Sequence, residues 1–193
     1  PLDGDAGLSV NVAVGSIFSV LRCPEGADPA DPAAFLQAGR RQLCAGYALY
    51  GPATMLVLTV GRGVHGFTLD RGFGEFILTH PDLRIPDGTR EIAVNASSER
   101  LWDPPVKRYV TECMAGHGGP RGADYTTRWI ASPVAELHRL LLRGGMLLYP
   151  RDVEAPEEPG FLRLLGQADA MALLVEQAGG VASTGRARIL DVT

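Results

Sequence analysis

Three apolar runs, separated by glycine turns, lie between Cys44 and Leu78, and they constrain the fold more than any other feature of the sequence. Short β-branched and apolar runs joined in this way are typical of an antiparallel meander. The runs cover residues 47–60 (with a break at Gly51-Pro52), 64–69 and 75–78. Upstream, apolar residues occupy every second position from Leu8 to Val14, which predicts a strand with one buried face that resumes over 17–21.

The pattern changes after residues 81–90, a segment rich in proline and charge. Beyond it, helices are predicted to begin at Asp103-Pro104 and Ser132-Pro133, where a capping residue precedes a proline of the first turn. We expect a further helix at 170–178 and strands at 125–130, 146–149, 162–165 and 188–192. The sequence therefore predicts an α/β protein, with an antiparallel-rich sheet region in residues 1–85 followed by a smaller α/β domain in residues 86–193.

Composition and charge narrow the classes of function. The chain has 18 Lys and Arg against 22 Asp and Glu, a formal net charge of -4, so no basic field is available for nucleic-acid binding. The apolar run at 55–58 is far shorter than the roughly 20 residues of a membrane-spanning helix, and the N-terminus does not have the pattern of a signal peptide. Cys23, Cys44 and Cys113 lack metal-ligand spacing and predict reduced thiols. We expect a cytoplasmic protein that binds neither nucleic acid nor membrane.

Two carboxylates near the N-terminus are the first candidates for chemistry. Asp3 and Asp5 lie two residues apart in a loop, an arrangement that can offer oxygen ligands to Mg²⁺. Acidic turns are far commoner than metal sites, so from these residues alone an acidic turn is the preferred interpretation. His65 and His138 are interpreted as histidines at the edge of the core that bond to carbonyl groups. No glycine loop of the dinucleotide-binding or P-loop type occurs.

Seven strings spread over the whole chain carry a resemblance to a known family. In order and spacing they resemble class 1 fructose-1,6-bisphosphatase, most closely the proteobacterial type. The strings are residues 10–25, 45–51, 63–70, 74–82, 134–139, 147–150 and 175–180. The resemblance corresponds to the second part of that enzyme and implies the sugar-phosphatase fold without its N-terminal segment. In the family that segment supplies helices and the paired glutamates that hold metal.

The resemblance also implies which residues lie in the family's metal site. The family removes the 1-phosphate with Mg²⁺ ions held by carboxylates. The family's metal loop reads Asp-Pro-Leu-Asp-Gly-Ser-Ser-Asn, and its second aspartate corresponds to Asp3. The Ser-Ser-Asn that ends the loop is replaced in this chain by three residues that begin with Asp5. The family's string Gly-Lys/Arg-Leu-Arg-Leu-Leu-Tyr-Glu matches residues 160–167, so Phe161 replaces a substrate-binding cation and Gln167 replaces a metal-binding glutamate. We therefore expect degenerate catalytic positions at Asp3 and Gln167, with Asp3 and Asp5 as the remaining metal ligands.

The sugar-phosphate pocket of the family is better preserved. Asn95 matches an asparagine that contacts the 6-phosphate, and Tyr149 matches a tyrosine of the same pocket. Arg128 matches an arginine that reaches the site of a neighbouring subunit. Phe161 is the degenerate position of this pocket, because it replaces a substrate-binding cation of the family. Because the scaffold strings are intact while the changes concentrate in the catalytic strings, we expect a fold that was retained after metal-dependent hydrolysis was lost.

Three hypotheses follow, and they leave open whether the chain is an enzyme. The first is a pseudoenzyme that needs no cofactor, binds a sugar phosphate, and acts as a ligand-binding or interaction protein in a homo-oligomer or with a partner protein. The second is an active Mg²⁺-dependent fructose-1,6-bisphosphate 1-phosphatase completed by a missing segment or a partner chain. The third is a repurposed enzyme with non-hydrolytic chemistry, whose altered pocket has apolar walls from Phe161 and Trp129.

Overall fold

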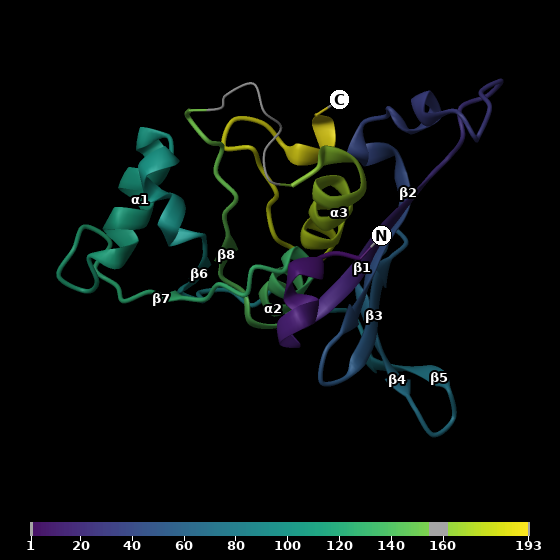
Figure 1. Ribbon diagram of the computed structural model, residues 1–193, viewed down its shortest axis with the longest axis horizontal. Coiled ribbons are helices and arrows are strands. Elements are labelled where there is room, and N and C mark those ends of the chain that lie inside the picture. The colour runs from purple at the N-terminus through teal and green to yellow at the C-terminus, as the bar shows by residue number, and fades with distance from the viewer. Residues whose placement is uncertain (1, 155–161, 193) are drawn as a thin grey trace.

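A computed structural model describes residues 2–154 and 162–192 of the chain. Its largest element is an antiparallel sheet in which every strand pairs with its neighbour in sequence (Figure 1). The strands are β1 (Val14–Leu21), β2 (Gln42–Tyr50), β3 (Thr54–Thr59), β4 (His65–Asp70) and β5 (Glu75–His80). The predicted meander is therefore confirmed.

The first predicted strand is wrong in its N-terminal half. Residues Asp5–Val10 form a short 3₁₀ helix, η1, which lies between two residues in the left-handed region, Gly4 (φ 78°) and Asn11 (φ 59°). The cause is a backbone pairing of Asp3 with Gly15, in which each N–H donates to the carbonyl of the other, at 2.6 and 3.0 Å. Because this pairing folds the N-terminus back onto β1, the residues in between form a compact turn, and Leu8 and Val10 of the alternating pattern remain exposed.

The second half of the chain contains a small parallel sheet and three helices. The sheet has the order β7-β6-β8, from β7 (Thr126–Thr127), β6 (Glu91–Ala93) and β8 (Met146–Leu147). The helices are α1 (Pro104–Met114), α2 (Pro133–Arg143) and α3 (Asp169–Gln177). The helix starts agree with the prediction: Asp103 precedes α1, and the hydroxyl of Ser132 accepts a hydrogen bond from the Ala135 N–H. No helix of the described residues is long and apolar enough to cross a membrane.

Two predicted strands of this half are wrong and two are shorter than expected. The strand expected at 162–165 does not form: the backbone is kinked and non-helical at Leu165 and Gly166, and Gly166, with a φ of 86°, reverses the chain ahead of α3. The C-terminal strand is instead a 3₁₀ turn, η6 (Ile189–Asp191), in which only Leu190 is buried. The strands expected at 125–130 and 146–149 pair with β6 over two residues each.

The main core lies between the antiparallel sheet and the two helices α2 and α3, which occupy one side of it (Figure 1). Tyr47 and Val57 face the helices from the sheet, and Leu137, Leu141 and Leu174 face the sheet; all five are at most 1% exposed. A second, smaller core holds α1 against β6. Helices α2 and α3 are thus fixed to the sheet by a continuous apolar layer.

Asp169, at the start of α3, gives a first testable prediction. Its side chain is buried, and burial raises the pKa of its carboxyl to about 6. A pKa raised above the ordinary value of 3.8 means that folding disfavours the charged form. The resulting destabilisation is complete above pH 6 and disappears as the pH falls below 3.8. Asp169→Asn is therefore expected to stabilise the fold at pH 7.5 by about 1 to 3 kcal/mol and to give a much smaller gain near pH 4.

Urea unfolding at the two pH values measures this difference. Asp87→Asn is the matched control, because Asp87 is exposed and the same loss of charge there should leave stability within about 0.5 kcal/mol. A gain that is equal at both pH values would contradict the assignment to burial of a charge.

Candidate functional site

Asp3 lies at the centre of the candidate site, held between the sheet and the first turn of α2. Its backbone is fixed by the pairing with Gly15, and its side chain is buried. One carboxylate oxygen, Oδ2, accepts a hydrogen bond of 3.0 Å from the Val134 N–H, one of the amides at the start of α2 that has no partner within the helix. The next residue must be Gly4, because it has a positive φ and a Cβ there would lie 2.8 Å from the Ser132 hydroxyl.

Gln167 binds the second oxygen of the same carboxylate. The turn at Gly166 presents the Gln167 side chain to Asp3, and Nε2 donates a hydrogen bond of 2.6 Å to Asp3 Oδ1. The other end of the amide is also held, since Oε1 accepts a hydrogen bond of 3.0 Å from the Arg163 N–H. The structure therefore brings together two of the predicted site residues, and both oxygens of the Asp3 carboxylate accept hydrogen bonds from the protein.

These residues do not fit a divalent metal. Mg²⁺ requires anionic oxygens to compensate for its lost water, and the amide at Gln167 supplies no charge. In the described ranges 2–154 and 162–192, no group of three or more His, Cys, Asp or Glu side chains is placed to hold a metal ion. Asp5 begins η1, but its side chain lies outside the described part of the structure. The described carboxylates and amide therefore do not form a magnesium site by themselves.

Tyr149 lies near this carboxylate centre. Burial raises the pKa of its phenol above the ordinary value, and the charges of Glu136 and Asp3 raise it further. Its ring contacts Trp129, with centroids 5.4 Å apart and planes at 58°. The phenol thus stays protonated at neutral pH, beside an aromatic wall and within reach of the Asp3 charge.

The other predicted pocket residues are held by local contacts. Asn95 is exposed and caps the 3₁₀ helix η4 (Ala96–Leu101): its Oδ1 accepts hydrogen bonds from the Ser97 N–H and hydroxyl, at 3.3 and 2.7 Å. Arg128 follows β7, donates its backbone N–H to the Ile92 carbonyl, and keeps a 53% exposed side chain 3.7 Å from Glu91. Phe161 lies outside the described residues.

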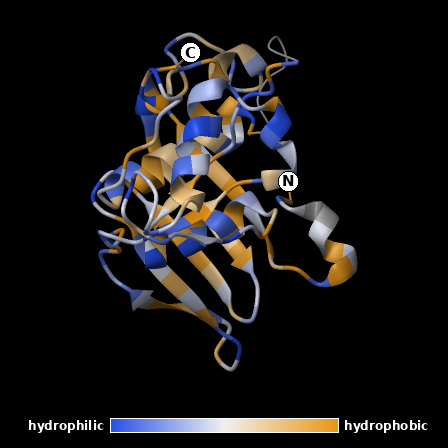
Figure 2. Ribbon diagram, turned by 90° about the vertical axis from the view of Figure 1, so that its left-hand side faces the viewer, coloured by the Kyte–Doolittle hydropathy of each residue, from blue (hydrophilic) through white to orange (hydrophobic). Residues whose placement is uncertain are grey.

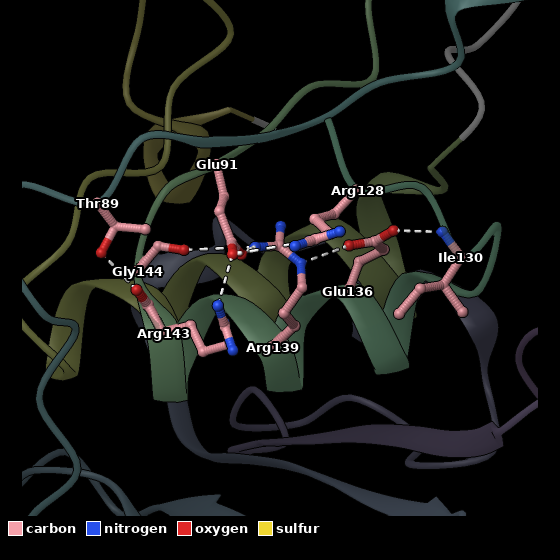
Figure 3. A network of polar contacts seen from close by, with 8 residues as sticks. All are labelled: Thr89, Glu91, Arg128, Ile130, Glu136, Arg139, Arg143 and Gly144. Carbon is pink, nitrogen blue, oxygen red and sulfur yellow. Dashed lines mark hydrogen bonds and ion pairs between the residues drawn. The ribbon is translucent and has the colours of Figure 1, made fainter. Parts of the chain in front are cut away.

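A buried ion-pair network supports the loop that carries Arg128 and Trp129, and the sequence analysis did not predict it (Figure 3). Arg139, with a side chain only 9% exposed, pairs with two buried carboxylates, Glu136 at 3.0 Å and Glu91 at 2.8 Å. The hydrogen bond from Arg143, followed by that from Arg139, holds the pKa of Glu91 below its ordinary value. Glu136 in turn accepts a hydrogen bond from the Ile130 N–H, which fixes the loop ahead of α2.

One feature of the sequence points to this ion-pair network. Glu136, Arg139 and Arg143 are spaced as one face of α2, but charged side chains at that spacing are usually a solvated face. Only the position of β6 beside α2, with Glu91 facing it, reveals that the Glu136 and Arg139 side chains of this face are shielded from solvent.

The two histidines have structural partners. His138 shares a hydrogen bond of 2.8 Å with the hydroxyl of the buried Tyr47, and not with a carbonyl as expected, because a buried phenol itself needs a partner. Burial, with a smaller contribution from His80, lowers the pKa of His138 to about 4, so it is neutral at pH 7. His65 accepts a hydrogen bond from the Asp82 N–H rather than donating to a carbonyl.

Comparison with known proteins gives a consistent family assignment. Residues 1–81 match the family model "Fructose-1-6-bisphosphatase, N-terminal domain" and residues 85–193 match its C-terminal domain. The class 1 fructose-1,6-bisphosphatases of Hydrogenophilus thermoluteolus and Methylobacillus flagellatus are 61% and 62% identical over 192 residues; the alignments cover 100% of this chain and 54% and 57% of those proteins. The crystal structure of apo Leishmania major fructose-1,6-bisphosphatase superimposes with a TM-score of 0.91 at 41% identity, over 100% of this chain and 62% of that one. The chain thus spans a little over half the length of these relatives.

Proposed function

The chain belongs to the fructose-1,6-bisphosphatase family, and from this premise we propose that it binds a sugar phosphate in a partial active-site pocket without hydrolysing it by metal-dependent chemistry. The observation that carries the proposal is the hydrogen bond from Gln167 Nε2 to Asp3 Oδ1. The family match is what makes these two residues the relevant ones.

The Asp3–Gln167 contact supports loss of the metal site because it satisfies the carboxylate without a cation. A carboxylate with a protein donor on each oxygen gains less from a metal, which would have to displace the short bond of 2.6 Å. A second carboxylate at position 167 would repel Asp3 and require a cation between them, whereas the glutamine amide attracts Asp3 directly. The pseudoenzyme proposal therefore rests on residues within the described chain and on their contacts.

The remaining pocket residues support binding of a sugar phosphate. The Tyr149 phenol stays protonated and can donate to a phosphate oxygen, and Trp129 provides an apolar wall for a sugar ring. Asn95 offers an amide from an exposed helix cap, and the exposed Arg128 side chain offers a cation to the site of a second subunit. The proposal thus includes a homo-oligomer, with Tyr149 and Asn95 as ligand contacts and Arg128 contributed by a neighbour.

Purified chain is expected to release no phosphate from fructose 1,6-bisphosphate above background, with Mg²⁺ or with Mn²⁺. The reason is that Asp3, the family carboxylate of the described site, is already bonded on both oxygens. A steady-state phosphate assay over a range of protein concentrations measures this. The proposal fails if release scales with protein, survives repurification and disappears in Asp3→Ala.

Binding of fructose 6-phosphate tests the pocket independently of turnover. We expect weak binding that Tyr149→Phe lowers about tenfold, since a hydrogen bond to a charged phosphate is lost. Asn95→Ala should weaken binding in the same direction, and Tyr50→Phe is the control because Tyr50 is exposed at the end of β2. Titration calorimetry gives the affinities. Micromolar binding that neither pocket variant changes would place the ligand elsewhere.

A second candidate is an active fructose-1,6-bisphosphate 1-phosphatase that uses Mg²⁺ and is completed by further chain. The 61% identity to a class 1 enzyme over 192 residues favours it. One experiment distinguishes the two candidate functions. The part of the Hydrogenophilus thermoluteolus protein that does not align with this chain is added as a separate polypeptide, together with Mg²⁺. Turnover that requires both polypeptides supports the second candidate, and ligand binding without turnover supports the first.

A further inference from the structure

Three arginines converge on the carboxylate of Glu91 (Figure 3). Arg139 Nη1 is 2.8 Å from one oxygen, Oε2, whereas Arg143 Nη2 and Arg128 Nε both approach the other oxygen, Oε1, at 2.8 and 3.7 Å. Arg128 follows β7, while Arg139 and Arg143 belong to α2. Glu91 of β6 therefore joins cations from two separate elements into one cluster.

This cluster has more cations than carboxylates. Its three guanidinium groups face two carboxylates, Glu91 and Glu136. The antiparallel sheet adds no described ion pair to it, and the strands of that sheet are largely hydrophobic (Figure 2). Arg139 shows the excess directly, because its Nη2 is buried and has no hydrogen-bond partner among the described residues. Buried donors are normally paired, so the cluster is short of acceptors and of negative charge.

Arg128 and Arg143 carry the excess charge to the surface. Their side chains are 53% and 64% exposed, whereas that of Glu91 is 8% exposed. The Arg128 contact of 3.7 Å is an ion pair beyond hydrogen-bonding distance, so Glu91 leaves the guanidinium donors of Arg128 unused. Two exposed cations thus meet at one carboxylate oxygen.

Two adjacent guanidinium groups are suited to bind a phosphate. Like charges this close repel each other, and a dianion between them removes the repulsion while it accepts hydrogen bonds from both. The planar fork of arginine also matches two phosphate oxygens at once. The C-terminal end of α2 opposes an anion only weakly, because the carbonyls of Arg143 and Gly144 already accept hydrogen bonds from Thr89 and Arg139.

From this geometry we infer that Arg128 and Arg143, held together at Glu91, form one phosphate-binding site. Arg143 is then a ligand-binding residue that the sequence analysis did not identify. The phosphate can come from two sources, a free phosphate ion or a sugar phosphate bound by a neighbouring subunit. The site follows from the ion-pair cluster, and only the second source rests on the proposed function, which gives Arg128 to a neighbour.

Inorganic phosphate is the probe for the site alone. In titration calorimetry at low ionic strength, Arg143→Gln and Arg128→Gln are each expected to weaken its binding about tenfold, since a charge-assisted bond is lost. Arg143→Lys should weaken binding less, because the charge remains while the paired donors are lost. Arg40→Gln is the matched control, since Arg40 is 58% exposed and pairs with one carboxylate, that of Asp191, at 3.1 Å. Circular dichroism verifies that each variant is folded.

Fructose 6-phosphate identifies the source of the phosphate. If the ligand of a neighbouring subunit supplies it, Arg143→Gln weakens fructose 6-phosphate binding, as Tyr149→Phe does. If a free phosphate ion is the ligand, Arg143→Gln weakens only the binding of inorganic phosphate, and Tyr149→Phe leaves that binding unchanged. Either result supports a site at Arg128 and Arg143.

Two results would overturn the inference. In one, the wild-type chain binds neither ligand, or Arg143→Gln changes the binding of neither. In the other, Arg40→Gln weakens the binding of inorganic phosphate as much as Arg143→Gln does, which would reduce the effect to overall charge. Binding of inorganic phosphate requires neither Tyr149 nor phosphate release, so a failure of the proposed function leaves this measurement intact.

Discussion

Gln167→Glu is expected to destabilise the chain in metal-free buffer and to make its stability depend on divalent cations. The substitution replaces the donor that bonds Asp3 Oδ1 at 2.6 Å with a second carboxylate. Loss of a hydrogen bond to a charged group costs about 1.5 to 3 kcal/mol, and repulsion between the two carboxylates adds to this. A cation that binds between them stabilises the folded state in proportion to the logarithm of its concentration.

Thermal unfolding in EDTA and in increasing Mg²⁺ or Mn²⁺ measures both effects. Wild type should unfold at the same temperature throughout, whereas Gln167→Glu should unfold at a lower temperature in EDTA and recover as metal is added. Gln167→Leu is the control, since it loses the same hydrogen bond but adds no ligand and should not recover. If Gln167→Glu is as stable as wild type in EDTA and indifferent to metal, the Asp3–Gln167 bond does not substitute for a cation.

Arg139→Met is expected to destabilise the fold strongly. The variant leaves two buried carboxylates, Glu136 and Glu91, without the cation that joins them. Breaking a buried pair by removal of one partner typically costs about 3 to 5 kcal/mol, because an uncompensated charge stays buried. The loop that carries Arg128 and Trp129 should loosen with it, since Glu136 also holds the Ile130 N–H.

The loss of stability caused by Arg139→Met should also depend on pH. Because the pKa of Glu91 is lowered by folding, its ion pairs stabilise the protein above the ordinary value of 4.5 and this stabilisation fades as the pH falls through the folded pKa. Urea unfolding should therefore show a larger difference between wild type and Arg139→Met at pH 7.5 than near pH 4. Arg143→Met is the control, with a 64% exposed side chain and an expected loss of about 1 kcal/mol or less. Equal losses for the two variants would contradict a special role for the buried arginine.

The parts of the fold that follow from local pattern were predictable. The glycine turns at Gly51 and Gly61–Gly63 delimit strands that pair with their sequence neighbours, so the meander needs no distant information. The starts of α1 and α2 were likewise visible from a capping residue followed by proline. Among the candidate residues, Asp3 and Gln167 were identified through the family resemblance, and their mutual hydrogen bond became visible only in the structure.

The predictions that failed depend on contacts between distant parts of the chain. Alternating apolar residues from Leu8 to Val14 would form a strand if a neighbour were available, but the pairing of Asp3 with Gly15 forces a turn instead. Residues 162–165 have strand composition, yet Gly166 turns them toward Asp3. The Glu91 and Arg139 pair is invisible to any local rule because its members are 48 residues apart.

The Asp3–Gln167 bond has a consequence for how the chain folds as it is made. Its two partners are 164 residues apart, so a ribosome must complete most of the chain before the bond can close. Closing a loop of that length carries an entropic cost that rises only slowly with length, and one strong bond at the end contributes to offsetting it. In this chain the group that bonds Asp3 is the side-chain amide of Gln167, which is part of the polypeptide itself and does not have to be bound from solution. This long-range connection is thus independent of how much free magnesium surrounds the nascent protein.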